Sequence, residues 1–257
     1  MDTQNFSLYK VIAFDLDNTL APSKLIIDKE MEELLAALLA KTKVAVISGG
    51  SFAQFEKELL DPLSCFDLFK NLHIFPTDGT AYYTYAKHEW TPVYQESLTQ
   101  QQKEKIMNAF QEVLGKLPSL YVSSQMLYGA LVEDRDSQIT FSGLGQQAPL
   151  EIKRSWDPDG KVRSAMKQLL QPMLPEFSIT IAGTTSIDVT PKDHDKAYAI
   201  SKICSYLNVT KEEILFIGDA LFLGGNDAPV ISTGVQTMAV RGPNETKLII
   251  KKMLSTL

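Results

Sequence analysis

The stretch VIAFDLDNTL at residues 11–20 decides the fold of this 257-residue chain. Its first four residues are apolar, and they run directly into Asp15, Asp17 and Thr19. A short continuous apolar run is typical of a parallel strand that helices cover on both faces. The stretch therefore predicts a central strand of an α/β sheet, with three polar side chains just beyond its carboxyl end.

Buried strands and amphipathic helices alternate on both sides of the chain's middle. Before the middle, Asp28 is placed to cap a helix with apolar residues at helical spacing, and apolar runs at 44–47 and 72–75 predict strands. After the middle, a helix is predicted at 195–206, strands at 214–217 and 236–240, and a helix at the C-terminus. Right-handed crossovers between such elements give a doubly wound parallel sheet.

The middle of the chain has a different pattern. Strand-like pieces at 81–85, 121–123, 129–133 and 138–141 accompany two helices, one starting at the capping box Thr99-x-x-Gln102 and one at 161–170. Strands with helices on one side indicate an α+β unit. We therefore predict a core formed by residues 1–81 and 188–257, and an inserted α+β domain at 82–187.

Composition excludes several classes of partner. The net charge of −6 and the pI near 5.2 argue against nucleic-acid binding. The sequence has no run of eighteen apolar residues, so no membrane-spanning helix is predicted. Cys65 and Cys204 do not form a disulfide framework, and the first ten residues do not resemble a secretory signal. The expected setting is cytoplasmic, and the expected partner is a small molecule.

Polar residues follow three of the predicted buried strands: Asp15, Asp17 and Thr19 after the first, Ser48 and Gly49 after the second, and Asp219 after a later one. Ligands of open α/β sheets bind beyond the carboxyl ends of the strands, so these residues should converge. Gathered carboxylates need a cation, and oxygen ligands suit Mg²⁺. A carboxylate can also attack phosphorus, although isolated Asp residues more commonly cap loops.

Four segments, VIAFDLDNTL, VISGG, DHDKAYAI and FIGDALFLGGNDAPV, resemble in order the motifs of the haloacid dehalogenase (HAD) superfamily. The form of the last motif and the segment TSIDVTPKDHDK are similar to eukaryotic phosphomannomutases and related phosphatases with a C2B cap. The resemblance implies an HAD-like doubly wound parallel-sheet core with an inserted α+β C2B-type cap that selects the substrate.

The resemblance also assigns roles in the core. Asp15 would attack phosphorus, Asp17 would act as general acid and then general base, and Lys196 would neutralise both the nucleophile and the phosphoryl group. Thr19, Ser48 and the backbone near Gly49 would bind the phosphoryl oxygens. The ligands of Mg²⁺ would be Asp15, the Asp17 carbonyl and Asp219, with Asn226 and Asp227 in supporting positions and Asp227 orienting Lys196 or a water.

In the cap, Ser186, Asp188 and Arg135 match positions that bind substrate or phosphate in the family, and Lys24 in the first loop takes the place of another arginine. The family's G-R-S is replaced by Gly145-Gln146-Gln147, its next arginine falls near Lys153 and Arg154, and Asn18 replaces a glycine. Lysine and glutamine do not reproduce the bidentate grip of arginine on a phosphate. We therefore expect a Mg²⁺-dependent phosphatase acting on a sugar phosphate, with a phosphomannomutase-like hexose phosphate mutase as the alternative.

Two non-enzymatic alternatives are a phospho-receiver and a binding module. Receivers have about half this length and no acid two residues beyond the phosphoacceptor, whereas every core residue that the motifs require is present. The resemblance to phosphomannomutases also leaves open a homodimer formed through the cap.

Overall fold

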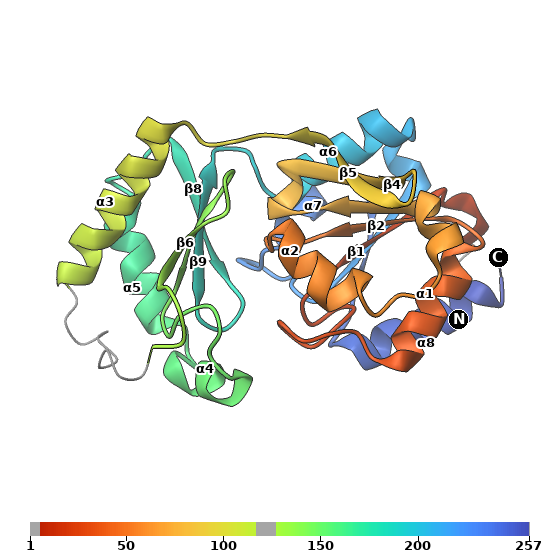
Figure 1. Ribbon diagram of the computed structural model, residues 1–257, viewed down its shortest axis with the longest axis horizontal. Helices are drawn as coiled ribbons and strands as arrows, with labels where there is room; N and C mark the ends of the chain where they lie inside the picture. The colour runs from red at the N-terminus through yellow and green to blue at the C-terminus, as the bar shows by residue number, and fades with distance from the viewer. Residues whose placement is uncertain (1–5, 117–126, 257) are drawn as a thin grey trace. The chain divides into compact units, whose positions relative to one another are not determined.

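The structure is a computed structural model that describes residues 6–116 and 127–256. The chain divides into two compact units, a core unit of Met1–Gln95 with Asp195–Leu257 and a cap unit of Glu96–His194 (Figure 1). Within the described residues, no helix combines the length and apolar character needed to cross a membrane.

Over its described residues, the core unit contains seven strands and five α-helices. The strands are β1 (Val11–Asp15), β2 (Lys43–Ile47), β3 (Leu72–Phe75), β4 (Ala81–Ala86), β5 (Glu89–Gln95), β10 (Ile214–Gly218) and β11 (Gln236–Ala239). The helices are α1 (Lys29–Leu39), α2 (Phe52–Phe55), α6 (Lys196–Leu207), α7 (Ala228–Ser232) and α8 (Pro243–Leu254).

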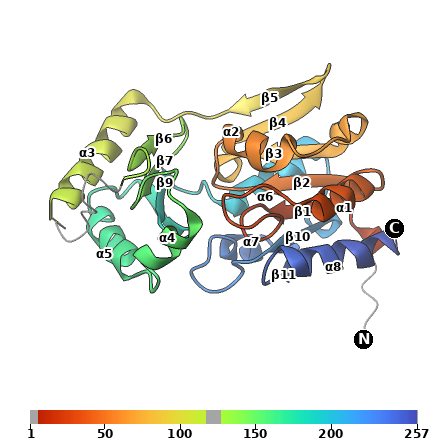
Figure 2. The same ribbon diagram turned by 60° about the horizontal axis from the view of Figure 1, so that its bottom comes forward.

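The strands of the core unit form one sheet in the order β11-β10-β1-β2-β3-β4-β5, parallel from β11 to β3. Alternate residues of β1 point to opposite faces: Ile12 and Phe14 pack with α1 and α8, whereas Val11 and Ala13 pack with α6 and α7. Figures 1 and 2 show α1 and α8 together on one side of the sheet. The prediction of a doubly wound α/β core is confirmed.

The hairpin of β4 and β5 belongs to the core sheet, because β4 pairs antiparallel with β3. The predicted boundary after residue 81 placed this hairpin in the inserted domain, whereas the core unit extends to Gln95 and resumes at Asp195. Alternation of apolar and polar residues identifies a strand but not the sheet that it joins. The observed boundaries therefore differ from the predicted ones.

The cap unit is an α+β layer structure. Its elements are α3 (Gln100–Lys116), β6 (Val132–Asp134), β7 (Ile139–Ser142), α4 (Leu150–Trp156), α5 (Lys161–Leu170), β8 (Phe177–Ala182) and β9 (Ser186–Pro191). The antiparallel sheet has the order β6-β7-β9-β8, and α3 and α5 cover one of its faces (Figure 1). This arrangement agrees with the predicted class of the inserted domain.

Local signals located the two long cap helices well. The capping box at the start of α3 is present, because the Thr99 N–H donates to Gln102 Oε1 at 2.8 Å and the Gln102 N–H donates to Thr99 Oγ1 at 3.3 Å. Strands β8 and β9 were not predicted. The strand predicted at 121–123 lies outside the described residues.

Candidate active site

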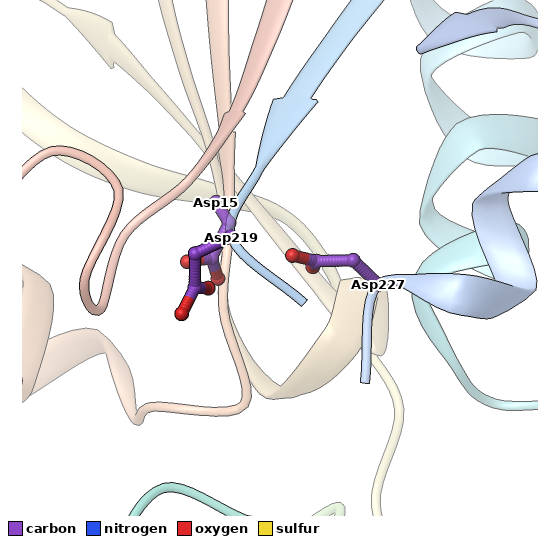
Figure 3. Close-up of side chains that lie close together, drawn as sticks. All are labelled: Asp15, Asp219 and Asp227. Carbon is purple, nitrogen blue, oxygen red and sulfur yellow. The ribbon is translucent and has the colours of Figure 1, made fainter. Parts of the chain in front are cut away.

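Carboxylates meet at the carboxyl edge of the core sheet, where β1 ends at Asp15 and its neighbour β10 ends one residue before Asp219. Asp227 precedes α7 and completes the cluster, in which one oxygen of each carboxylate lies within 4.8 Å of the others. Figure 3 shows Asp15 and Asp219 next to each other, with Asp227 reaching toward them. The convergence expected from the strand ends is therefore present for Asp15 and Asp219.

Lys196 lies among these carboxylates as the first residue of α6. Asp195 caps the helix, since its carboxylate accepts hydrogen bonds from the backbone N–H groups of Ala197 at 2.8 Å and Tyr198 at 3.2 Å. The fully buried Lys196 ammonium forms ion pairs with Asp15 Oδ1 and, at 2.5 Å, with Asp227 Oδ1. Burial alone would lower the pKa of Lys196, but the negative charges of Asp15 and Asp227 outweigh it and raise this pKa above its ordinary value.

Asp227 uses both of its carboxylate oxygens inside the protein. Oδ1 binds Lys196, and Oδ2 accepts the N–H of Ala220 at 2.9 Å. A Cβ at Gly218 would lie 2.3 Å from Asp227 Oδ2, so only glycine leaves room for this side chain. These contacts suit the supporting role expected for Asp227, because they hold Lys196 and the loop after β10 in place.

Two buried oxygens at the site, Asp15 Oδ2 and Thr19 Oγ1, have no hydrogen-bond partner among the described residues. A buried polar atom without a partner costs about 1–3 kcal/mol, so native proteins seldom keep one without a function. Burial raises the pKa of Asp15 well above its ordinary value, against the opposing effect of Lys196. The two oxygens have the chemistry expected of a nucleophile and a phosphoryl-binding hydroxyl.

The acidic cluster suits a divalent cation. Burial, followed by the charge of Asp227, raises the pKa of Asp219 to about 6. A cation held between Asp15 and Asp219 would relieve the repulsion between the carboxylates and favour their ionised forms. All the donor atoms are oxygens, which is the ligand type that Mg²⁺ prefers.

The loop after β1 holds Asp17 in a fixed turn. Asp17 Oδ1 accepts the N–H of Lys24 at 2.7 Å, and the carbonyl of Leu16 accepts the N–H of Leu20 at 2.9 Å. Asn18 has a φ of 59°, in the left-handed region that glycine and asparagine adopt most readily. Asparagine is therefore compatible with the conformation of this turn. The substrate-binding role of Lys24 stays a prediction.

Ser48 and Gly49 follow β2 and begin the next loop. Ser48 Oγ accepts the N–H of Gly50 at 3.1 Å, which leaves the hydroxyl hydrogen of Ser48 available to donate to a phosphoryl oxygen. The carbonyl of Ser48 accepts the N–H of Asp78 at 3.0 Å. Asn226 lies in the loop after β10, and its supporting role stays a prediction.

The turn after β3 is a part of the site that the sequence analysis missed. Thr77, Asp78 and Gly79 have φ values of 46°, 53° and 88°, so three consecutive residues are left-handed. A Cβ at Gly79 would lie 2.6 Å from Ala199 of α6, and the charge of Asp78 acts on Lys196. Non-glycine residues in this region cost about 1–3 kcal/mol and cluster at functional sites. The Asp-Gly pair signals a turn, but nothing in the sequence signals its contact with α6.

Glu58 is a second residue that the sequence analysis missed. It lies on a π-helical turn, Glu56–Leu60, and is 4% exposed. Burial, followed by the charge of Asp17, raises the pKa of Glu58 to about 7, although Gln54 Nε2 donates to its carboxylate at 3.2 Å. A π turn changes the residue spacing, so helical periodicity gives no indication that the charge of Asp17 acts on this acid.

In the cap unit, Arg135 lies in the turn between β6 and β7. Its Nε donates to Glu133 at 2.7 Å, and its Nη2 donates to the Gln146 side-chain oxygen at 3.3 Å. Lys153 of α4 is buried and donates to the Gln146 carbonyl oxygen at 3.1 Å, whereas Arg154 is exposed. Arg135 and Lys153 therefore both donate hydrogen bonds to Gln146. Ser186 and Asp188 lie together on β9.

The profile of the family described as eukaryotic phosphomannomutase matches residues 31–256. The chain belongs to this family. It is 28% identical over 248 residues to phosphomannomutase 2 of Dictyostelium discoideum, covering 93% of this chain and 94% of the relative. The phosphomannomutase of Schizosaccharomyces pombe is 25% identical, with coverages of 95% and 94%.

Solved structures share the fold. An N-terminally truncated, IMP-bound IMP-nucleotidase of Plasmodium falciparum matches with a TM-score of 0.70 and 17% identity, over 98% of this chain and 71% of that chain. A haloacid dehalogenase-like hydrolase from Bacteroides thetaiotaomicron matches with a TM-score of 0.63 and 15% identity, over 95% and 99%. These matches confirm the HAD-like α/β fold.

Proposed function

We propose that this protein transfers a phosphoryl group of a small phosphorylated sugar through an aspartyl-phosphate at Asp15. The observation that carries the proposal is the arrangement of Asp15: Lys196 holds Oδ1, while Oδ2 is buried without a partner among the described residues. One oxygen is fixed and the other is left to react. The homodimer formed through the cap and the cytoplasmic location stay predictions.

The first half-reaction forms a bond from Asp15 Oδ2 to phosphorus and breaks the bond to the ester oxygen of the substrate. Asp17 gives its proton to that leaving oxygen. Lys196, the hydroxyls of Thr19 and Ser48, and the nearby backbone N–H groups neutralise the phosphoryl oxygens. In the second half-reaction, the Asp17 carboxylate removes a proton from the acceptor hydroxyl, which attacks phosphorus and releases Asp15.

Asp15, Asp219 and the backbone carbonyl of Asp17 would hold Mg²⁺. When bound, the ion would supply positive charge that offsets the negative charge of the phosphoryl group. The acidic cluster and the raised pKa of Asp219 support this assignment.

Removal of Mg²⁺ with a chelator is expected to abolish turnover, and readdition should restore it. Asp219→Asn keeps the side-chain shape but loses a charged ligand, so we expect at least a hundredfold lower turnover at low Mg²⁺, on the order seen for lost catalytic charge stabilisation. Addition of Mg²⁺ should also raise the Tm of the wild type but not that of Asp219→Asn. Full activity in protein shown by elemental analysis to lack metal would contradict the assignment.

Membership of the phosphomannomutase family favours a sugar hydroxyl as the final acceptor, and hence a hexose phosphate mutase. The sequence analysis instead favoured hydrolysis, because Gln146 replaces an arginine of the family. The buried amine of Lys153, which donates to Gln146 near Arg135, supplies a second cation in this part of the cap. A mutase must retain a bisphosphate intermediate, and a second cation would help to bind it. The contact of Lys153 therefore supports the mutase as the first candidate.

Hydrolysis remains the second candidate because of the partners of Arg135. Glu133 neutralises part of its charge at 2.7 Å, and Gln146 supplies no positive charge. A mutase must retain a bisphosphate intermediate, and each hydrogen bond to a charged group contributes about 1.5–3 kcal/mol. If the cap residues bind the bisphosphate more weakly, the intermediate can leave and water can reach the aspartyl-phosphate.

Phosphorus NMR distinguishes the two candidates. Mannose 1-phosphate and glucose 1-phosphate are each incubated with the protein, Mg²⁺ and a catalytic amount of the matching 1,6-bisphosphate. A mutase converts the 1-phosphate to the 6-phosphate with little free phosphate, whereas a phosphatase releases inorganic phosphate. Turnover of neither ester, under conditions in which the protein is folded, would contradict the proposed substrate class.

A further inference from the structure

The cap sheet has one apolar and one polar face. Ile139, Phe141, Ile187 and Val189 pack against the core formed with α3 and α5. Because side chains alternate along a strand, the residues directly before and after each of these four point to the other face. These are Gln138, Thr140, Ser142, Ser186, Asp188 and Thr190, all of them buried. Within this set, which lies in the described part of the cap, Asp188 is the one ionisable residue.

A directional hydrogen-bond chain leads to Asp188. Gln138 Nε2 donates to Thr140 Oγ1 at 2.8 Å, and Thr140 Oγ1 donates to Asp188 Oδ1 at 2.7 Å. Thr140 and Asp188 are direct neighbours on the paired strands β7 and β9. The amide can only donate to the hydroxyl here, so the hydroxyl hydrogen is directed at the carboxylate.

This chain does two things to Asp188. It fixes the carboxylate in one orientation, and it donates a hydrogen bond to one carboxylate oxygen, Oδ1. The oxygens of a carboxylate accept hydrogen bonds from hydroxyl groups, and they offer no hydrogen to the oxygens of a phosphate. Asp188 itself, rather than the whole polar face, therefore suits a hydroxyl-bearing part of a substrate rather than a phosphate.

We propose that Gln138 and Thr140 are positioning residues that hold Asp188 to accept hydrogen bonds from substrate hydroxyl groups. The inference rests on the proposed function, since it assumes a phosphorylated sugar as the substrate. The resemblance to the family already implies that Asp188 binds substrate, and the inference adds the two residues that orient it, Gln138 and Thr140.

The test compares a hydroxyl-rich ester with one that has no hydroxyl group. The probes are mannose 1-phosphate, or glucose 1-phosphate where that reacts faster, and p-nitrophenyl phosphate. Thr140→Val keeps the side-chain shape and removes the hydrogen bond to Asp188. We expect the ratio of kcat/KM for the sugar phosphate to kcat/KM for the aryl phosphate to fall by about tenfold to a hundredfold, mainly through a higher KM.

Three further variants separate positioning from structural damage. Thr140→Ser retains the hydroxyl and should restore most of the ratio. Thr190→Val removes a hydroxyl from the same face, one that donates to the His194 carbonyl at 3.1 Å, and should leave the ratio unchanged. Gln138→Met removes only the hydrogen bond from Gln138 to Thr140, so it should lower the ratio less than Thr140→Val does. If Thr140→Val does not fold, Gln138→Met provides the test in its place.

An unchanged ratio in Thr140→Val, or an equal fall in Thr190→Val, would overturn the inference. A wild type that cleaves the aryl phosphate but neither sugar phosphate would also overturn it, while leaving the chemistry at Asp15 intact. A wild type that acts on no phosphate ester would instead contradict the proposed function itself.

Discussion

Asp15→Asn is expected to lower turnover by roughly four to six orders of magnitude, on the scale seen when other enzymes lose a nucleophile. Asparagine has the same shape as aspartate, but its amide cannot attack phosphorus. Lys196 would still bind Asp227, so the fold should survive the change. Steady-state turnover of a phosphate ester measures the loss, and circular dichroism with thermal unfolding checks the fold.

The matched control is Asp67→Asn, because Asp67 is exposed and lies outside the site. It should retain wild-type turnover. More than about one per cent of wild-type turnover in purified Asp15→Asn would remove Asp15 from the role of nucleophile.

Lys196→Met is expected to combine a large loss of stability with a loss of activity. Methionine fits the volume but leaves the buried carboxylates of Asp15 and Asp227 without their cation. Removal of one partner of a buried ion pair costs about 3–5 kcal/mol of unfolding free energy. Urea unfolding followed by fluorescence measures this cost.

Lys192→Met is the control for that change, since Lys192 is four residues earlier and exposed. It should be close to neutral in both stability and turnover. The stability deficit of Lys196→Met should shrink toward acidic pH, because protonation removes the negative charges that the ammonium group had neutralised. A variant as stable as the wild type at neutral pH would contradict the buried ion-pair arrangement.

The sequence predicted the core well where local patterns determine the structure. The run before Asp15 is a central parallel strand, and the predicted helix at 161–170 matches α5. Strand partnership was harder, because it depends on contacts between distant segments. The hairpin of β4 and β5 therefore appeared to belong to the insertion, although it pairs with β3.

The candidate site was predictable where its residues follow strands. Asp15 and Asp219 lie at the ends of neighbouring strands, so topology alone brings them together. Asp78 and Glu58 reach the site through a left-handed turn and a π-helical turn, which leave no periodic signal. The structure was likewise needed to show which basic residue of α4 is buried: it is Lys153, whereas Arg154 is exposed.

The central claim is that Asp15 carries the phosphoryl group during turnover. The direct test quenches the reacting enzyme rapidly, reduces it with borohydride and maps the modified residue by mass spectrometry. Reduction of an aspartyl-phosphate converts the aspartate to homoserine. We predict homoserine at Asp15 only when substrate and Mg²⁺ are both present. Modification of Asp17 instead, or product formation with Asp15 never modified, would contradict the mechanism.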